Sequence, residues 1–83
     1  MKFENANVLI TGGASGIGKI MGRMALEKGA KTFIIWDINI TNIEAVRREL
    51  ASLGKVKGYA VDVSKPEMVA LAYRKTISDC GNI

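Results

Sequence analysis

The 83-residue sequence contains no histidine, one cysteine and one proline, and these shortages exclude several kinds of chemistry. Without histidine, the chain cannot build a Ser-His-Asp or Cys-His nucleophile system or a metal site ligated by imidazole. Cys80 has no second cysteine for a disulfide or a zinc pair, and a single unpaired thiol fits a reducing compartment. We therefore expect a cytoplasmic protein with no metal site and no disulfide.

A long hydrophobic run is also missing. The longest unbroken apolar stretch, Met68 to Tyr73, has six residues, whereas a helix that crosses a bilayer needs ~18. The first residues, Met1 to Glu4, lead into no signal-peptide core. Hydrophobic residues still make up 48% of the chain, which favours a folded core over a disordered linker. We expect a chain with no membrane partner that forms one domain or part of one.

The charge is unbalanced, because 12 Lys and Arg stand against 8 Asp and Glu and give a net charge of +4. A basic chain is a candidate for nucleic-acid binding. The longest basic clusters, however, are the pairs Arg47-Arg48 and Arg74-Lys75, each within a helical pattern. A nucleic-acid patch usually has a run of ~5–8 basic residues. We interpret the charges as solvated helix faces and predict no nucleic-acid partner.

Short apolar runs alternate with segments of helical spacing along the chain. Strands are expected at 7–11, 31–36 and 56–61, because such runs are typical of strands buried on both faces of a parallel sheet. The resulting order βαβαβα predicts an α/β fold with a parallel sheet and right-handed crossovers. In a doubly wound sheet these strands lie in the order 3-2-1, and a fourth pairs with the other side of strand 1.

The helices are predicted by apolar spacing and by their end signals. The first is expected from Gly16 on one apolar face: Ile17, Ile20, Met21, Met24 and Ala25. Two capping boxes, Thr41-x-x-Glu44 and Ser64-x-x-Glu67, predict the starts of the other two, because a hydroxyl can accept from the third helical N–H. Glycines at 29, 54 and 81 are expected to end the helices, the last of which should run to about residue 78.

A glycine-rich segment, Thr11 to Gly18, joins the first strand to the first helix. Its glycines read Gly-x-x-x-Gly-x-Gly, without the Gly-Lys-Ser/Thr of a P-loop. A diphosphate needs backbone N–H donors and a helix N-terminus nearby, and a turn without side chains at Gly12 and Gly16 permits that approach. Gly18 would let the helix pack closely on the strand. A tight turn with no ligand is the alternative, but the position between strand and helix favours a phosphate site.

Asp37 follows the second strand, 19 positions beyond Gly18. This matches the ~20-residue interval at which an acidic residue reaches the adenosine ribose of a dinucleotide. One carboxylate can accept from both ribose hydroxyls, whereas its charge would repel a 2′-phosphate. Neither Ser15 nor Ile38 offers a basic side chain to hold such a phosphate, so the pattern predicts NAD rather than NADP. The alternative for Asp37 is a solvated strand-end residue or a cap of the next helix.

Asp62 follows the third strand and therefore reaches the same edge of the sheet. Its carboxylate could accept from the adenine amino group, with Val63 packing on the base. The alternative is a turn residue ahead of the third helix, and the sequence alone leaves both interpretations open.

These segments together resemble the amino-terminal portion of a short-chain dehydrogenase/reductase. The run Thr11-Gly12-x-x-x-Gly16-Ile17-Gly18 is similar to that family's cofactor turn, Asp37 to its NAD-selecting acid, and Asp62-Val63 to its adenine-contacting pair. The resemblance implies a Rossmann-type fold in which 1–83 is the NAD-binding half-domain, a fragment without the catalytic part. The expected NAD contacts are Gly12, Ser15, Gly16, Ile17, Gly18, Asp37, Ile38, Asp62 and Val63. The stretch 35–39 is similar to the branch containing retinol and hydroxysteroid dehydrogenases.

The catalytic residues of that family have no counterpart in this sequence. Its catalytic Ser and Tyr-x-x-x-Lys follow the fourth strand, and the positions four beyond Tyr59 and Tyr73 hold Val63 and Ile77 instead of Lys. The resemblance implies part of a homo-oligomeric oxidoreductase that transfers hydride between NAD(H) and a small alcohol or carbonyl substrate. By itself the chain is expected to be inactive. A free-standing module that senses a dinucleotide, or interacts with a partner without catalysis, is the alternative.

Overall fold

The computed structural model describes residues 3–83. The elements found there, in chain order, are β1 (Asn7–Thr11), α1 (Gly16–Glu27), β2 (Thr32–Asp37), α2 (Ile40–Leu50), β3 (Lys55–Ala60) and α3 (Pro66–Cys80). The strands form one parallel sheet in the order β1-β2-β3. This confirms the predicted α/β class, the βαβαβα order and the 3-2-1 strand arrangement. The predicted bounds of β2 and β3 are each wrong by one residue.

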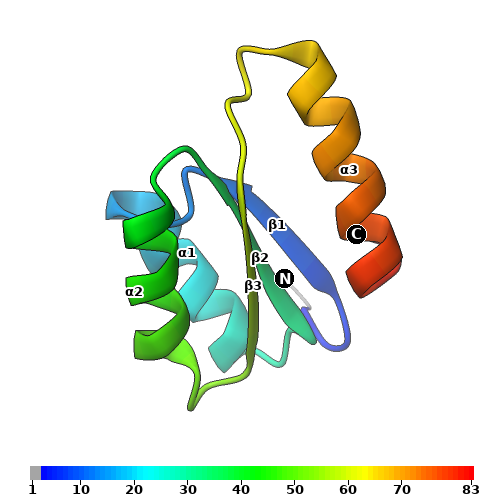
Figure 1. Cartoon of the computed structure of the whole chain (residues 1–83). Helices are drawn as coiled ribbons and strands as arrows, with labels where there is room; N and C mark the ends of the chain where they lie inside the picture. The colour runs from blue at the N-terminus through cyan, green and yellow to red at the C-terminus, as the bar shows by residue number, and fades with distance from the viewer. Residues whose placement is uncertain (1–2) are drawn as a thin grey trace.

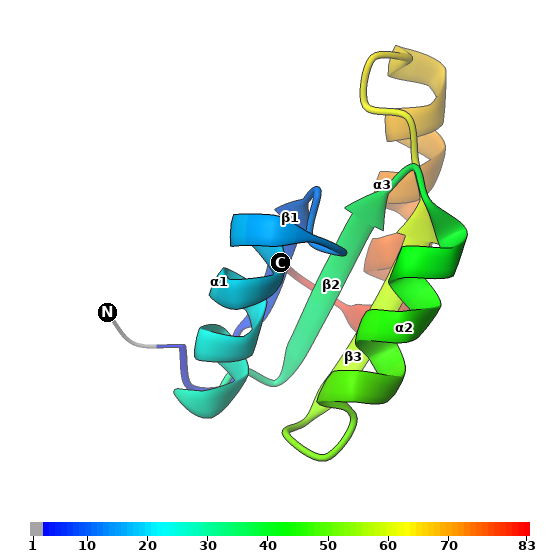
Figure 2. The ribbon, with the colours of Figure 1, turned by 90° about the vertical axis from the view of Figure 1, so that its left-hand side faces the viewer.

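The sheet lies between two layers of helix, with α1 and α2 on one face and α3 on the other (Figure 1). Figure 2 views the same sheet from the side of α1 and α2, with α3 behind it. The central strand β2 is buried on both faces because successive side chains alternate. Phe33 and Ile35 join the core beneath α1 and α2, whereas Ile34 and Trp36 join the core beneath α3.

Helix α1 packs on the sheet through a face other than the predicted one. Gly22, Ala25 and Leu26 are its buried residues. The large apolar residues that predicted the helix are 49–76% exposed: Ile17, Ile20, Met21 and Met24. A Cβ on Gly22 would overlap the Phe33 ring, so only a glycine allows the helix to lie this close to β2. The approach of the backbone decides which face is buried, and of the predicted face only Ala25 lies in the core.

Both predicted capping boxes are wrong. Helix α2 begins at Ile40, before Thr41, and its N-cap is Asn39. The side-chain oxygen of Asn39 accepts from the Asn42 N–H at 3.0 Å, which satisfies one of the free donors of the first turn. Helix α3 begins at Pro66 with Lys65 rather than Ser64 as its N-cap, and no side-chain hydrogen bond caps it.

The predicted helix ends are confirmed at two of three glycines. Gly29 and Gly81 follow α1 and α3 with φ of +93° and +86°, a region that favours glycine. Helix α2 instead ends at Leu50, ahead of a turn over 51–53, so Gly54 does not terminate it. Helix α3 runs to Cys80, two residues beyond the prediction. None of the helices in residues 3–83 has the length and apolar content that a bilayer crossing requires.

Candidate functional site

The turn between β1 and α1 exposes bare backbone at Gly12 and Gly16. Their φ angles are +71° and +55°, which residues with side chains adopt only at a cost. Apart from the adjoining residues of the chain and the backbone of α1 itself, no described atom lies within 4 Å of the position that a Cβ would take on either glycine. The Gly12 N–H donates to the Trp36 carbonyl oxygen at 2.7 Å, which ties the turn to the end of β2. Gly16 is the first residue of α1, and the free N–H groups of a helix N-terminus favour an anion.

Gly18 lies where the turn is closed. A Cβ there would overlap the carbonyl oxygen of Gly12 and would stand 3.0 Å from the Cα of Gly13. The first turn of α1 is thus packed directly on the preceding loop, with no room for a side chain. This contact fixes the position of the helix N-terminus relative to Gly12.

The Asp37 carboxylate joins the glycine turn to the end of β2. Its Oδ2 accepts from the Ala14 N–H at 3.2 Å, and its Oδ1 accepts from the Asn39 N–H at 3.0 Å. Asn39, and not Asp37, caps α2, so the capping alternative for Asp37 is wrong. Each carboxylate oxygen has a second lone pair, so the group can accept further hydrogen bonds from a ligand hydroxyl.

A cavity of about 370 Å³ opens at the carboxyl ends of all three strands. Five of the nine predicted contact residues line it: Gly12, Asp37, Ile38, Asp62 and Val63. Ser15 and Gly16 line a neighbouring cavity of about 300 Å³ on the α2 side of the turn. Ile17 and Gly18 line neither of these two cavities, and Ile17 is 76% exposed. The fold thus gathers residues from three separate loops at one edge of the sheet.

The Asp62 carboxylate is engaged within its own turn. Its Oδ1 accepts from the Ser64 N–H at 3.0 Å and from the Ser64 hydroxyl at 2.6 Å. Both bonds hold the pKa of the Asp62 carboxyl below its ordinary value of 3.8, and the bond from the hydroxyl has the larger effect. Oδ1 therefore has the turn role that the sequence left open, while Asp62 and the 55% exposed Val63 still line the cavity.

Two features of the site have no signal in the sequence. The Ala14 N–H contacts Asp37 through the backbone, which any residue could provide. Trp36 lines the cavity while its buried indole N–H donates to the Thr76 hydroxyl at 3.1 Å, which connects the cavity to α3. Trp36 and Thr76 are forty positions apart, and hydrogen bonds at such separations follow only from the fold.

Comparison with known proteins identifies the family. The family model for short chain dehydrogenases matches residues 6–83. The chain is 34% identical to the 3-oxoacyl-[acyl-carrier-protein] reductase FabG of Thermotoga maritima over 84 residues, 100% of this chain and 34% of that protein. A short chain dehydrogenase from Mycobacterium smegmatis matches with 31% identity and a TM-score of 0.89, over 98% of this chain and 35% of that one.

A solved structure of NAD⁺-bound xylitol dehydrogenase has a TM-score of 0.92 over 100% of this chain and 32% of its own, at 24% identity, which shows the shared fold. The protein therefore belongs to the short-chain dehydrogenase family, and it corresponds to the amino-terminal portion of that family's Rossmann fold. The chain spans about a third of the length of the curated relatives it matches.

Proposed function

We propose that this chain is the NAD-binding half-domain of an oxidoreductase that transfers hydride between NAD(H) and an alcohol or carbonyl substrate. The observation that carries the proposal is the Asp37 carboxylate, which lines the strand-end cavity and accepts from the Ala14 N–H of the glycine turn. This hydrogen bond links the carboxylate that would bind the ribose to the turn that would bind the phosphates. The family of the chain supports the reaction class.

The residues present fit a dinucleotide. Gly12 and Gly16 leave open space beside bare backbone, which suits the close approach of a diphosphate. Asp37 would accept from the ribose hydroxyls, and Asp62 and Val63 would contact the adenine. Bound NAD supplies the hydride acceptor, and these residues hold and orient it.

Charge at the turn supports NAD over NADP. A 2′-phosphate would lie against the Asp37 carboxylate, whose negative charge repels it. Ser15 and Ile38, the neighbouring side chains, carry no positive charge to offset that repulsion.

The proposed half-domain binds the cofactor without performing the reaction. Hydride transfer to a carbonyl requires a proton donor, and the sequence has no Tyr-x-x-x-Lys pair to provide one. We assign the reaction to a complete enzyme that is cytoplasmic and homo-oligomeric, with no nucleic-acid or membrane partner. We expect the isolated 83 residues to bind NAD weakly and to show no turnover.

The chain's single tryptophan, Trp36, lines the cavity and offers a direct measurement, because NADH accepts energy from indole fluorescence. We expect NADH to bind more tightly than NADPH. Asp37→Asn should lower the ratio of the NADPH dissociation constant to the NADH dissociation constant by about tenfold, the equivalent of about 1.4 kcal/mol. Asp79→Asn removes the same charge from α3, where the carboxylate accepts from Tyr59, and should leave the preference unchanged. An unaltered preference in Asp37→Asn would contradict the proposal.

A further inference from the structure

Strand β3 forms an edge of the sheet. In residues 3–83 it pairs only with β2, so alternate N–H and C=O groups of Lys55–Ala60 point outward without a strand partner. Six residues of strand span about 20 Å, enough to accept an extended segment of another chain. What this edge can bind depends on the side chains around it.

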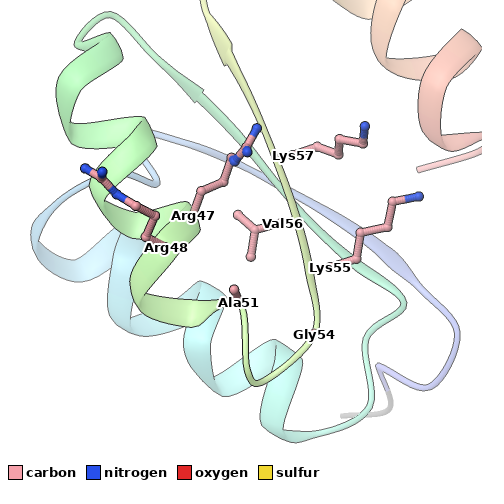
Figure 3. A pocket seen from close by; sticks show the side chains of 7 residues that line it. All are labelled: Arg47, Arg48, Ala51, Gly54, Lys55, Val56 and Lys57. Carbon is pink, nitrogen blue, oxygen red and sulfur yellow. The ribbon is translucent and has the colours of Figure 1, made fainter.

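A basic cavity of about 390 Å³ adjoins the start of β3 (Figure 3). Four cationic residues line it: Arg47, Arg48, Lys55 and Lys57. Figure 3 shows Arg47 reaching from α2 toward β3, while Lys55 and Lys57 extend from the other side of the strand. A segment lying along the edge would therefore meet positive charge on both of its faces.

These charges are largely uncompensated within the described residues. Arg47 has the one ion pair of the four, with Glu44 at 3.9 Å. The only carboxylate between 47 and 57, that of Glu49, already pairs with Lys19 on α1 at 2.8 Å. The start of the β3 edge thus has a positive field that acidic side chains would complement.

The other end of the edge is apolar. A cavity of about 600 Å³ lies between β3 and α3, and its wall includes Ile40 and Leu71, which are 54% and 62% exposed. Lys75 lines the same cavity with its ammonium group 5.9 Å from the centroid of the Tyr59 ring. This end can bury an apolar side chain of a partner.

Two other occupants fit the edge less well. Pairing β3 with the β3 of a second copy would bring lysines against lysines, which is unfavourable. A single-stranded nucleic acid would need aromatic side chains for its bases, and the basic cavity has none. An extended acidic peptide can pair with the basic side chains, bond to the free backbone groups and place an apolar side chain in the cavity at the same time.

We propose that the β3 edge binds an extended acidic peptide segment of a partner protein, which adds to the sheet as a further strand. Its carboxylates face Arg47, Lys55 and Lys57, and an apolar residue enters the cavity between β3 and α3. The basic cavity shares no lining residue with the cavity that contains Asp37, and the apolar cavity shares only Val61 with it, so the proposal does not rest on the proposed cofactor function.

The test is calorimetric titration with an eight-residue peptide of five Glu followed by Leu, Val and Leu, whose carboxylates project from both faces of an extended strand. Lys57→Glu should weaken its binding by about tenfold or more, because reversal replaces attraction with repulsion. Lys28→Glu makes the same change at the end of α1, which packs over β1 and β2, and should leave the affinity within about twofold. Amide exchange at 55–60 should slow when the peptide binds.

A second peptide with every backbone nitrogen methylated keeps every side-chain charge but has no N–H left to donate to a strand. Loss of its binding supports strand addition. Equal binding of the methylated peptide, equal loss in both lysine variants, or absence of binding would each overturn the proposal. Tighter binding of a single-stranded oligonucleotide that Lys57→Glu abolishes would also overturn it, because the edge would then be a nucleic-acid surface.

Discussion

The glycines between β1 and α1 have two different roles, and the structure separates them. Gly12 and Gly16 have positive φ and open space beside them, so the absence of their side chains allows a ligand to reach the backbone of the turn. Gly18 contacts the backbone of Gly12, so it matters for how the helix packs. A substitution at Gly16 should therefore affect a ligand more than the fold, and one at Gly18 the reverse.

Gly16→Asn tests the open position. Asparagine tolerates positive φ, so the free energy of unfolding should fall by no more than about 1 kcal/mol. Its side chain would occupy the space at the N-terminus of α1, and NADH affinity measured through Trp36 should fall by about tenfold or more. Gly29→Asn, at φ +93° beyond the other end of α1, is the matched control and should leave the affinity unchanged. Equal losses of NADH affinity in the two variants would mean that the substitutions act through the backbone conformation and not through the site.

Ser64→Ala should raise the pKa of Asp62 toward 3.8, because it removes the hydroxyl donor and leaves only the backbone N–H. A carboxyl with a lowered folded-state pKa stabilises the fold above its unfolded pKa, and this contribution is lost as pH falls through the folded value. The wild-type chain should therefore lose stability below about pH 4, and the variant should lose less. Carboxyl NMR titration measures the pKa. Ser78→Ala, on α3, should leave it unchanged.

The sequence predicted only part of what single residues contribute to the site. Gly12 and Asp37 carry a recognisable spacing, and the fold does bring them to one cavity. The bond from the Ala14 N–H to Asp37 involves a backbone donor, which has no residue signature. Ser64 contains the hydroxyl expected of a helix cap, yet the N-cap of α3 is Lys65, and the Ser64 hydroxyl donates to Asp62 within the preceding turn. Competition between nearby polar groups is decided by geometry that spacing does not contain.

At the scale of elements, the start of α2 shows how two good signals compete. Thr41 has the spacing of a capping box, but Asn39 lies two residues earlier and bonds to the Asn42 N–H. The Asp37 carboxylate accepts from the Asn39 N–H and fixes the loop in the conformation that presents this cap. The helix therefore begins where the loop from β2 permits it.

Asn39→Ala should destabilise the chain by about 1 kcal/mol, because one N–H of the first turn loses its partner. Thr41→Ala should change stability by no more than about 0.5 kcal/mol, since Thr41 lies exposed within the helix and does not cap it. Urea denaturation of the two variants measures both values. A larger loss in Thr41→Ala than in Asn39→Ala would contradict the assignment of the cap.

Helix α1 shows why element existence was predictable and orientation was not. Apolar residues at helical spacing correctly indicated a helix, but most of those residues face outward. Gly22 packs against Phe33, and this contact depends on the absence of a side chain. Hydrophobic periodicity is dominated by large apolar residues. It therefore cannot identify a helix face that is buried because its side chains are small enough for the backbone to pack closely on the sheet.

For the whole molecule, the two sheet edges differ in charge. Strand β3 carries Lys55 and Lys57, which discourage pairing with another copy of itself. Strand β1, from Asn7 to Thr11, carries no charged residue and pairs only with β2 in residues 3–83. Its outer backbone groups are the more favourable template for a second chain, and a chain of this length buries too little surface to resist such contacts easily.

We therefore expect the 83-residue chain to self-associate through β1 at concentrations of about 10 µM to 1 mM, where exposed strand edges lead to association. Light scattering should show the mass rising with concentration, and amide exchange should slow at 7–11 but not at 55–60. Thr11→Lys and Ala60→Lys place the same charge at exposed residues that end the two edge strands. The first should prevent association because the ammonium groups of two chains would meet at the β1 edge, and the second should not. A monodisperse monomer throughout this range, or equal effects of the two variants, would show that β1 is not the associating edge.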